Sequence, residues 1–238
     1  MATGQASGLG PGPWDEEAAW FGLTHAAHTA SSAPRREPMA VSIATHALTR
    51  GDAHAVLRAG PLRHRPAHAD QLHVDVWLDG TPVAVDPGSY RYTAAAPWAN
   101  ALAGEDVHNL PTMVGKPQAV RRGRFFWSRW TEAETRWSHE GAGLSARLAR
   151  LSLGEHTLTR LVVVADGLVA VLDDCAGAPA EVRWNVLGTV ESSAEAVAGR
   201  ADAAGPGWRA SMVGGSVRVP VPVDDDPTSG WHSPTYAR

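Results

Sequence analysis

The sequence predicts an all-β fold, an antiparallel β-sandwich, with a poorly ordered N-terminal segment. From residue 40 onward, short runs of alternating apolar and polar residues are separated by turn residues, a pattern typical of half-buried strands. Asp79-Gly80 and Asp166-Gly167 are pairs that favour two-residue hairpin turns, because both positions tolerate positive φ. No pattern of a long amphipathic helix separates the runs, which favours a sandwich over a mixed fold.

The first 38 residues differ in composition from the rest of the chain. They are rich in Gly, Pro, Ala and Ser, which is typical of a linker or a remnant of a preceding element. The sandwich domain is therefore expected over residues 39–238. Residues 230–236 contain aromatic side chains and are followed by no strand pattern, which is consistent with a domain truncated at its C-terminus.

Each strand is placed by its alternation and by the turn residues that bound it. The stretch 189–207 is rich in Ala, Ser and Gly and is expected to be a loop. Strands are expected at residues 53–57, 72–78, 82–85, 107–114, 124–130, 133–138, 144–151, 157–165, 168–172, 182–187, 208–212 and 216–223.

The composition excludes several classes of protein. A net charge of −4 argues against a nucleic-acid partner, because phosphate binding requires a basic surface. The single cysteine, Cys175, excludes an internal disulfide and a multi-cysteine zinc site. No stretch approaches the roughly 20 apolar residues of a membrane span. Residues 1–12 lack the basic start and apolar core of a signal peptide, so the literal sequence predicts a cytoplasmic location.

Candidate metal ligands gather around the first Asp-Gly pair. His68 and His73 precede it, and Asp86 and His108 follow it. Imidazole nitrogens and a carboxylate oxygen are suitable ligands for a divalent metal such as zinc. The alternative is that these are ordinary polar residues on a solvated sheet face.

A tight Asp-Gly turn fixes a register for the hairpin. Leu78 then pairs with Thr81, and Asp86 falls opposite His73, which makes His73 a better ligand than His68 on register alone. His68 reaches Asp86 only if the chain bends or a bulge shifts the register. The same register puts His73, Asp75, Trp77, Ala84 and Asp86 on one face and Val74, Val76, Leu78, Val83 and Val85 on the core face.

Several longer strings resemble the C-terminal domain of the heparinase II/III family. They are RPAHADQLHVDVW at residues 65–77, VDPGSYRY at 85–92, PWANAL at 97–102, VHN at 107–109 and GRFFW at 123–127. They occur in the family's order, and the resemblance covers about residues 40–190 with a weaker echo at 230–236.

The resemblance implies a fold, an activity and a ligand set. Members of the family are polysaccharide lyases, or suspected lyases, in which an α/α-toroid precedes a β-sandwich and the site lies between them. His68, Asp86 and His108 match the positions that bind a structural zinc. The resemblance therefore favours His68 over His73 and requires a bend before Leu72. The implied partners are an acidic polysaccharide and a toroid domain encoded elsewhere.

The sequence also departs from the family's pattern. Many members carry a histidine where this chain has Pro66, and 38 linker-like residues cannot encode a toroid. The chain alone is therefore expected to lack lyase activity, with Tyr90 and Tyr92 as weak candidates for moving protons in β-elimination of a uronic acid. The rival interpretation is a non-catalytic carbohydrate-binding or structural module. Membership of a longer enzyme would imply the cell envelope or periplasm.

A further expectation concerns the surface beside the candidate site. If the sandwich packs against a toroid, its facing loops carry an apolar patch rimmed by polar groups. The stretch 97–102, with Trp98, is the candidate for this patch.

Overall fold

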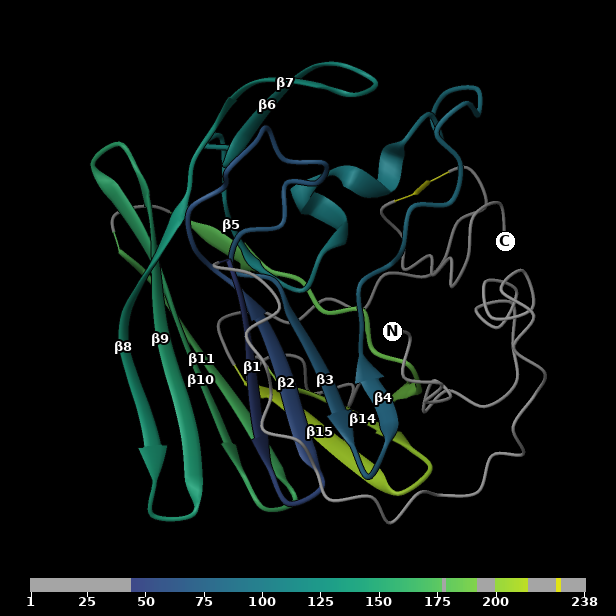
Figure 1. The fold of residues 1–238 in the computed structure, drawn as a ribbon. Helices are drawn as coiled ribbons and strands as arrows, with labels where there is room; N and C mark the ends of the chain where they lie inside the picture. The colour runs from purple at the N-terminus through teal and green to yellow at the C-terminus, as the bar shows by residue number, and fades with distance from the viewer. Residues whose placement is uncertain (1–43, 177–178, 192–199, 214–225, 228–238) are drawn as a thin grey trace, which may run out of the picture.

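The computed structural model describes residues 44–176, 179–191, 200–213 and 226–227. The expected linker at 1–38 and the expected strand at 216–223 lie outside these ranges. Two four-stranded antiparallel sheets face each other (Figure 1), in the orders β1-β2-β3-β4 and β11-β10-β9-β8. The prediction of an all-β antiparallel fold is confirmed.

The strand bounds show where each sheet draws its residues. The first sheet contains β1 (Thr45–Arg50), β2 (Ala53–Arg58), β3 (Val74–Leu78) and β4 (Thr81–Ala84). The second contains β8 (Ala133–Gly141), β9 (Leu144–Leu153), β10 (His156–Ala165) and β11 (Leu168–Ala176). The smaller ladders are β5 (Pro111–Met113) with β12 (Ala180–Val182), β6 (Ala119–Gly123) with β7 (Phe126–Trp130), and β13 (Thr189–Glu191) with β14 (Arg200–Gly205) and β15 (Trp208–Val213).

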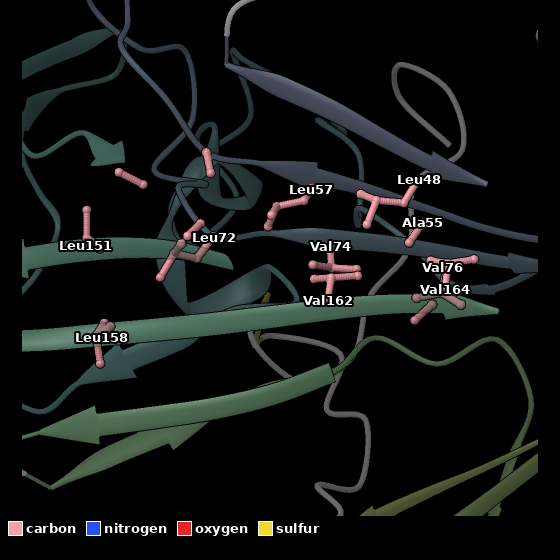
Figure 2. Close-up of a cluster of buried hydrophobic side chains, with 14 of the residues drawn as sticks. Leu48, Ala55, Leu57, Leu72, Val74, Val76, Leu151, Leu158, Val162 and Val164 are labelled. Atoms are coloured by element: carbon pink, nitrogen blue, oxygen red, sulfur yellow. The ribbon is translucent and has the colours of Figure 1, made fainter. Parts of the chain in front are cut away.

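The core lies between the two main sheets (Figure 2). Alternate residues of β10 are buried, and Val162 faces Val74 of the opposite sheet, while Leu158 and Leu57 belong to the same buried cluster. Each of these four side chains is at most 1% exposed. Burying an aliphatic side chain of this size contributes about 1.5–3 kcal/mol, so the apolar alternation read from the sequence holds the sandwich together.

Both predicted hairpin turns are confirmed. Leu78 pairs with Thr81 across the first turn, where φ is 48° at Asp79 and 70° at Gly80. The second turn joins β10 to β11 and places a glycine at φ 65°. Turn chemistry is local, so a dipeptide suffices to predict it.

Other strand predictions were wrong in part. β1 and β6 were not expected, and η3 (Glu105–Val107) and β5 replace the single strand expected at 107–114. The loop expected at 189–207 contains β13 and β14 instead. The sequence of β14, RADAAG, has low intrinsic β-propensity, and its pairing with β15 overrides that preference.

Gly188 is a position where only a glycine fits. A Cβ added there would lie 2.5 Å from the Ala204 carbonyl oxygen and 2.7 Å from the Trp208 ring. We expect Gly188→Ala to lower the free energy of unfolding by about 1–3 kcal/mol through overpacking. Gly123→Ala is the matched control, because its Cβ meets only the Phe126 Cβ at 3.6 Å. Equal urea midpoints for the two variants would contradict the prediction.

Helices contribute little to the part of the chain that the structure describes. The 3-10 helices η2 (Ala101–Ala103) and η3 have three residues each. Among the described residues, no helix has the length and hydropathy needed to cross a membrane.

Candidate metal centre

A β-bulge in the first hairpin changes the predicted register. Trp77 pairs with Pro82, but Val76 pairs with Ala84, so Val83 is an extra residue on β4. Pro82 has no N–H to donate to a ladder, and bulges are places where a strand tolerates proline. The register that set Asp86 opposite His73 was therefore wrong beyond Trp77. Ala84, expected on the outer face, is instead buried in the core.

The chain bends sharply before β3. Leu72 has φ 70°, and its N–H donates to the Arg58 carbonyl at 2.7 Å. The His73 N–H donates to the Asp70 carbonyl at 3.0 Å, which closes the bend. This turn leaves His68 ahead of the strand and free of its register.

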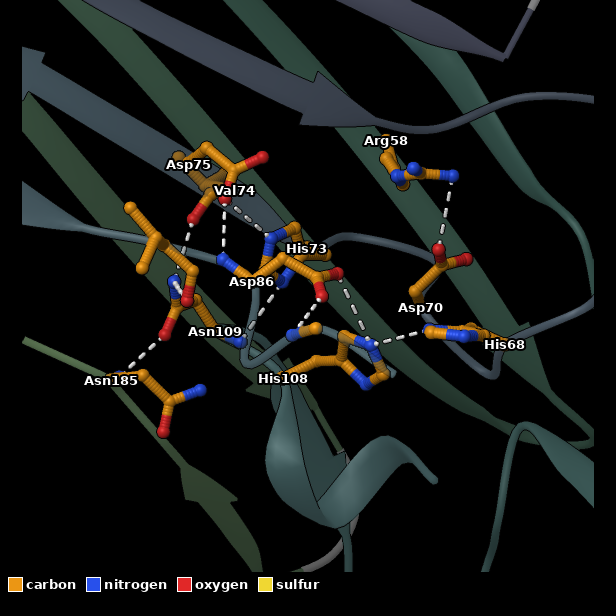
Figure 3. A network of polar contacts seen from close by, with 12 residues as sticks. Arg58, His68, Asp70, His73, Val74, Asp75, Asp86, His108, Asn109 and Asn185 are labelled. Atoms are coloured by element: carbon orange, nitrogen blue, oxygen red, sulfur yellow. Dashed lines mark hydrogen bonds and ion pairs between the residues drawn. The ribbon is translucent and has the colours of Figure 1, made fainter. Parts of the chain in front are cut away.

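The structure groups His68, Asp86 and His108 (Figure 3). The Nε2 atom of His108 lies 3.2 Å from Nδ1 of His68 and 3.4 Å from Oδ2 of Asp86. One ligand atom from each residue lies within 4.8 Å of the other two. His108 is fully buried, and the other two side chains are partly buried. Bulge and bend thus bring together three residues that come from distant parts of the sequence.

The hydrogen bonds of His108 define which of its nitrogens faces the group. Its Nδ1 lies 2.5 Å from the Gly104 carbonyl oxygen and must donate a proton there. The neutral ring therefore turns the lone pair of Nε2 toward Asp86 and His68. A lone pair facing a carboxylate oxygen is repulsive, so this position favours a cation, either a proton on Nε2 or a metal ion.

Burial and the contacts among His68, Asp86 and His108 also shift the pKa values of these three residues. Burial disfavours the His108 imidazolium, but the hydrogen bond and charge of Asp86 outweigh it and raise the pKa of His108. Burial acts to raise the pKa of Asp86, yet contact with His108 holds that pKa well below its usual range. Burial and the neighbouring His108 lower the pKa of His68. His108 thus lies between His68 and Asp86, and the negative charge of Asp86 favours the protonated form of its ring.

The geometry fits a tetrahedral zinc ion. Two ligand atoms that each lie about 2.0–2.1 Å from zinc at a tetrahedral angle are about 3.4 Å apart. The distances from His108 Nε2 to the other two ligand atoms, 3.2 and 3.4 Å, match that edge. Zinc-binding histidines commonly donate their second ring N–H to a backbone carbonyl, as His108 does to Gly104. The donor set and its outer contacts therefore suit zinc.

His73 occupies a different place in the network. Its Nδ1 accepts the Asn109 N–H at 3.0 Å, and its Nε2 donates to Asp75 Oδ1 at 3.0 Å. The same Asp75 oxygen accepts the Asp86 N–H at 2.7 Å. Both ring nitrogens of His73 are thus hydrogen-bonded to protein groups, and His73 helps to position the Asp86 backbone only through Asp75.

Asn109 is a site residue whose role the sequence analysis missed. Its side-chain amide donates to the carbonyls of Val74 and Val85 at 3.1 Å each, and its Oδ1 accepts the Asn185 N–H at 2.5 Å. Asn109 therefore connects β3, the end of β4 and the segment after β12 at the position next to His108 in the chain. Its place next to His108 in the sequence was the available signal.

Arg160 was also missed. It is fully buried on β10, and its guanidinium makes two bonds to Asp173, of 2.6 and 2.8 Å. It also donates to the Leu72 and Asn109 carbonyls at 2.7 and 2.5 Å. The signal lay in the alternation of β10, where an arginine occupies a core-facing position between Leu158 and Val162.

The candidate tyrosines lie in aromatic contacts. Tyr90 packs edge-on against Trp98, and Tyr92 against Phe125, each with ring centroids 5.4 Å apart. Among the described contacts, neither hydroxyl is hydrogen-bonded to the metal-ligand group. Trp98 is half-buried, and Leu102 is fully buried, so the stretch 97–102 is less exposed than expected.

Comparisons with known proteins agree with this fold. The mutant form of heparan sulfate lyase HepC from Pedobacter heparinus superposes with a TM-score of 0.54 at 14% identity, over 68% of this chain and 26% of that one. The heparinase III BT4657 gene product gives a TM-score of 0.51 at 18% identity, over 63% and 23%. The chain thus spans about a quarter of the length of these structures.

The sequence itself is matched by one family model. No curated protein sequence matches the chain significantly. The model described as "Heparinase II/III-like, C-terminal" matches residues 33–238, which is most of the chain. The chain therefore belongs to the heparinase II/III-like C-terminal family, a family of polysaccharide lyases.

Proposed function

We propose that this chain is the β-sandwich part of a lyase that cleaves uronic-acid-containing polysaccharides by β-elimination. It contributes a metal centre and one wall of the substrate cleft. The observation that carries the proposal is the grouping of His68, Asp86 and His108 in a chain that matches the family over residues 33–238. Structures of similar fold are described as heparan sulfate lyases, which supports an acidic polysaccharide as substrate.

The proposed metal is zinc, and its role is structural. His68 comes from the bend before β3, Asp86 from the end of β4, and His108 from the residue after η3. When bound, the ion supplies the positive charge that holds three ligands from separate loops together. Because such a site does not exist in the unfolded chain, metal binding stabilises the fold.

β-Elimination requires more catalytic groups than the described candidate residues supply. β-Elimination on a uronic acid requires neutralisation of the carboxylate, a base for the C5 proton and an acid for the leaving oxygen. Pro66 stands where many family members have a histidine, and Tyr90 and Tyr92 pack against aromatic rings. We therefore propose that an α/α-toroid domain supplies the catalytic groups. Action on large polysaccharides would place the assembled enzyme in the cell envelope.

The test is a lyase assay on sulfated and unsulfated uronic-acid polysaccharides. The chain alone is expected to give no increase in the ultraviolet absorbance of unsaturated uronate, and addition of the toroid domain is expected to produce it. Mass spectrometry of the products supplies a second readout. Strong activity of the chain alone would refute the incomplete-enzyme proposal. Absence of products from the assembled pair would favour the non-catalytic module.

A further inference from the structure

We infer that the β6–β7 hairpin and the two loops packed against it form a binding surface for a polyanionic glycan chain. The inference rests on the proposed function and deepens it, because it assigns the part of the chain that recognises the substrate's charge. We call this region the arginine surface. Its three segments carry seven arginines, all exposed except the partly buried Arg121: Arg63, Arg65, Arg91, Arg121, Arg122, Arg124 and Arg129.

The arginine surface is positively charged, although the chain as a whole has a negative net charge. The net charge of the whole sequence is −4. Residues 119–130, which form the hairpin, contain four arginines and no acidic residue. The loops 59–68 and 87–104 contain three more arginines and again no acidic residue. The surface is therefore a local cationic patch on an acidic protein.

These arginines are not neutralised by the protein. In the described part of the chain, none of the seven lies within ion-pair distance of a carboxylate, whereas Arg50, Arg58 and Arg136 each form an ion pair. Asp106 acts on Arg121 electrostatically without pairing with it. Burial and the nearby charge of Arg124 lower the pKa of Arg121. The guanidinium groups of Arg121 and Arg124 thus lie near each other, and Asp106 offsets this repulsion only in part, because it forms no ion pair with Arg121.

Direct contacts join the three segments into one surface. Arg65 lies over the Phe126 ring at 5.1 Å, which links the first loop to the hairpin. The Arg121 guanidinium donates to the Ala99 carbonyl at 2.9 Å. The Asn100 amide in turn donates to the Arg124 carbonyl at 2.7 Å. The backbone of the three segments is therefore held in place before any ligand arrives, which reduces the entropic cost of binding.

The arginine surface borders the candidate metal centre. Trp127 of the hairpin is buried with Ala69 and Ala103 in a small apolar cluster. Its indole N–H donates to the Ala67 carbonyl at 3.3 Å, one residue before His68. In Figure 1, β6 and β7 extend beyond the ends of the main sheets, on the side where the loop from β4 to β5 also lies. A chain bound along the hairpin thus leads toward the metal centre.

The side chains suit a sugar polymer with repeated anionic groups. Guanidinium groups bind carboxylates and sulfates through two parallel hydrogen bonds. Phe125 and Phe126 are 58% and 49% exposed beside them and offer apolar faces to sugar rings. Several separated charges with aromatic rings between them match an extended polyanion better than a single small anion.

The test compares arginine variants in the full 238-residue chain. The side chains of Arg122, Arg124 and Arg129 make no hydrogen bond or ion pair within the described residues, so their triple substitution by glutamine should leave the fold intact. Arg209→Gln on β15 is the matched control, an exposed arginine of a different sheet. Binding is measured by calorimetry to heparan sulfate, which carries sulfates, and to hyaluronan, which carries carboxylates alone.

We expect the triple variant to bind about tenfold or more weakly, with a shallower dependence on salt because fewer counterions are released. The control should bind as the wild type does. Loss on both polymers would assign carboxylate recognition, and loss on heparan sulfate alone would assign sulfate recognition.

Three outcomes would overturn the inference. They are unchanged binding by the triple variant, no binding by the wild type, and equal or tighter binding of single-stranded DNA of matched charge. These results are separable from the proposed function. Lyase products from the assembled enzyme together with normal binding by the triple variant would refute only the arginine surface. Arginine-dependent glycan binding without any lyase products would refute only the lyase.

Discussion

Arg160→Met is expected to lower the free energy of unfolding by about 3–5 kcal/mol, because it leaves the Asp173 carboxylate buried without its partner. The Asp173 side chain is only 12% exposed. The Leu72 and Asn109 carbonyls lose a charged donor in the same step. Urea denaturation followed by tryptophan fluorescence measures the change.

The controls separate the buried ion pair from simple loss of a charge. Arg150→Met on β9 removes an exposed arginine and should change stability by no more than about 0.5 kcal/mol. The double variant Arg160→Met/Asp173→Leu should recover most of the loss, because a matched apolar pair replaces a buried ion pair at little cost. A loss below about 1 kcal/mol for Arg160→Met alone would contradict this account.

Arg160 also connects the second sheet to the candidate metal centre. It reaches from β10 to the carbonyls of Leu72 and Asn109, the residues next to His73 and His108. Its guanidinium also lies 5.2 Å from the centre of the Trp184 ring. Arg160 therefore links the second sheet to the backbone beside two residues of the site.

The local features of the fold were predictable from the sequence. Alternating apolar residues predicted every strand of the two main sheets except β1, and the two Asp-Gly pairs predicted two of their turns. β14 was missed because its Ala-rich sequence forms a strand only beside β15. The bulge at Val83 was missed because it depends on how Pro82 meets a neighbouring strand, which a two-residue turn does not determine.

The candidate site was likewise predictable only in part. Register alone favoured His73, and the family resemblance favoured His68. The structure groups His68 with Asp86 and His108, and it gives His73 protein partners on both ring nitrogens. The positive φ at Leu72 that makes this grouping possible has no signature in the sequence, because leucine rarely adopts that conformation.

One divalent metal per chain, zinc above all, is expected in protein purified without chelator. The reason is that His68, Asp86 and His108 place one ligand atom each close together. The other ring nitrogen of His108 already donates to the Gly104 carbonyl, so its ligand nitrogen faces the group. Plasma mass spectrometry measures the content. Acidification should release the metal, because protons compete for the same lone pairs.

Removal of the metal is expected to lower the free energy of unfolding. The loss is about 4 kcal/mol relative to protein at a free metal concentration a thousandfold above the dissociation constant. His68→Ala should abolish metal binding and show the same loss, with little further damage, because His68 is only partly buried. His73→Gln is the matched control. It disturbs a fully buried histidine of the same network but removes no proposed ligand, so the variant should be less stable yet keep its metal. Wild-type protein that contains no metal and unfolds identically with and without chelator would refute the site. A His68→Ala variant that keeps the full metal content would move the ligand assignment to His73.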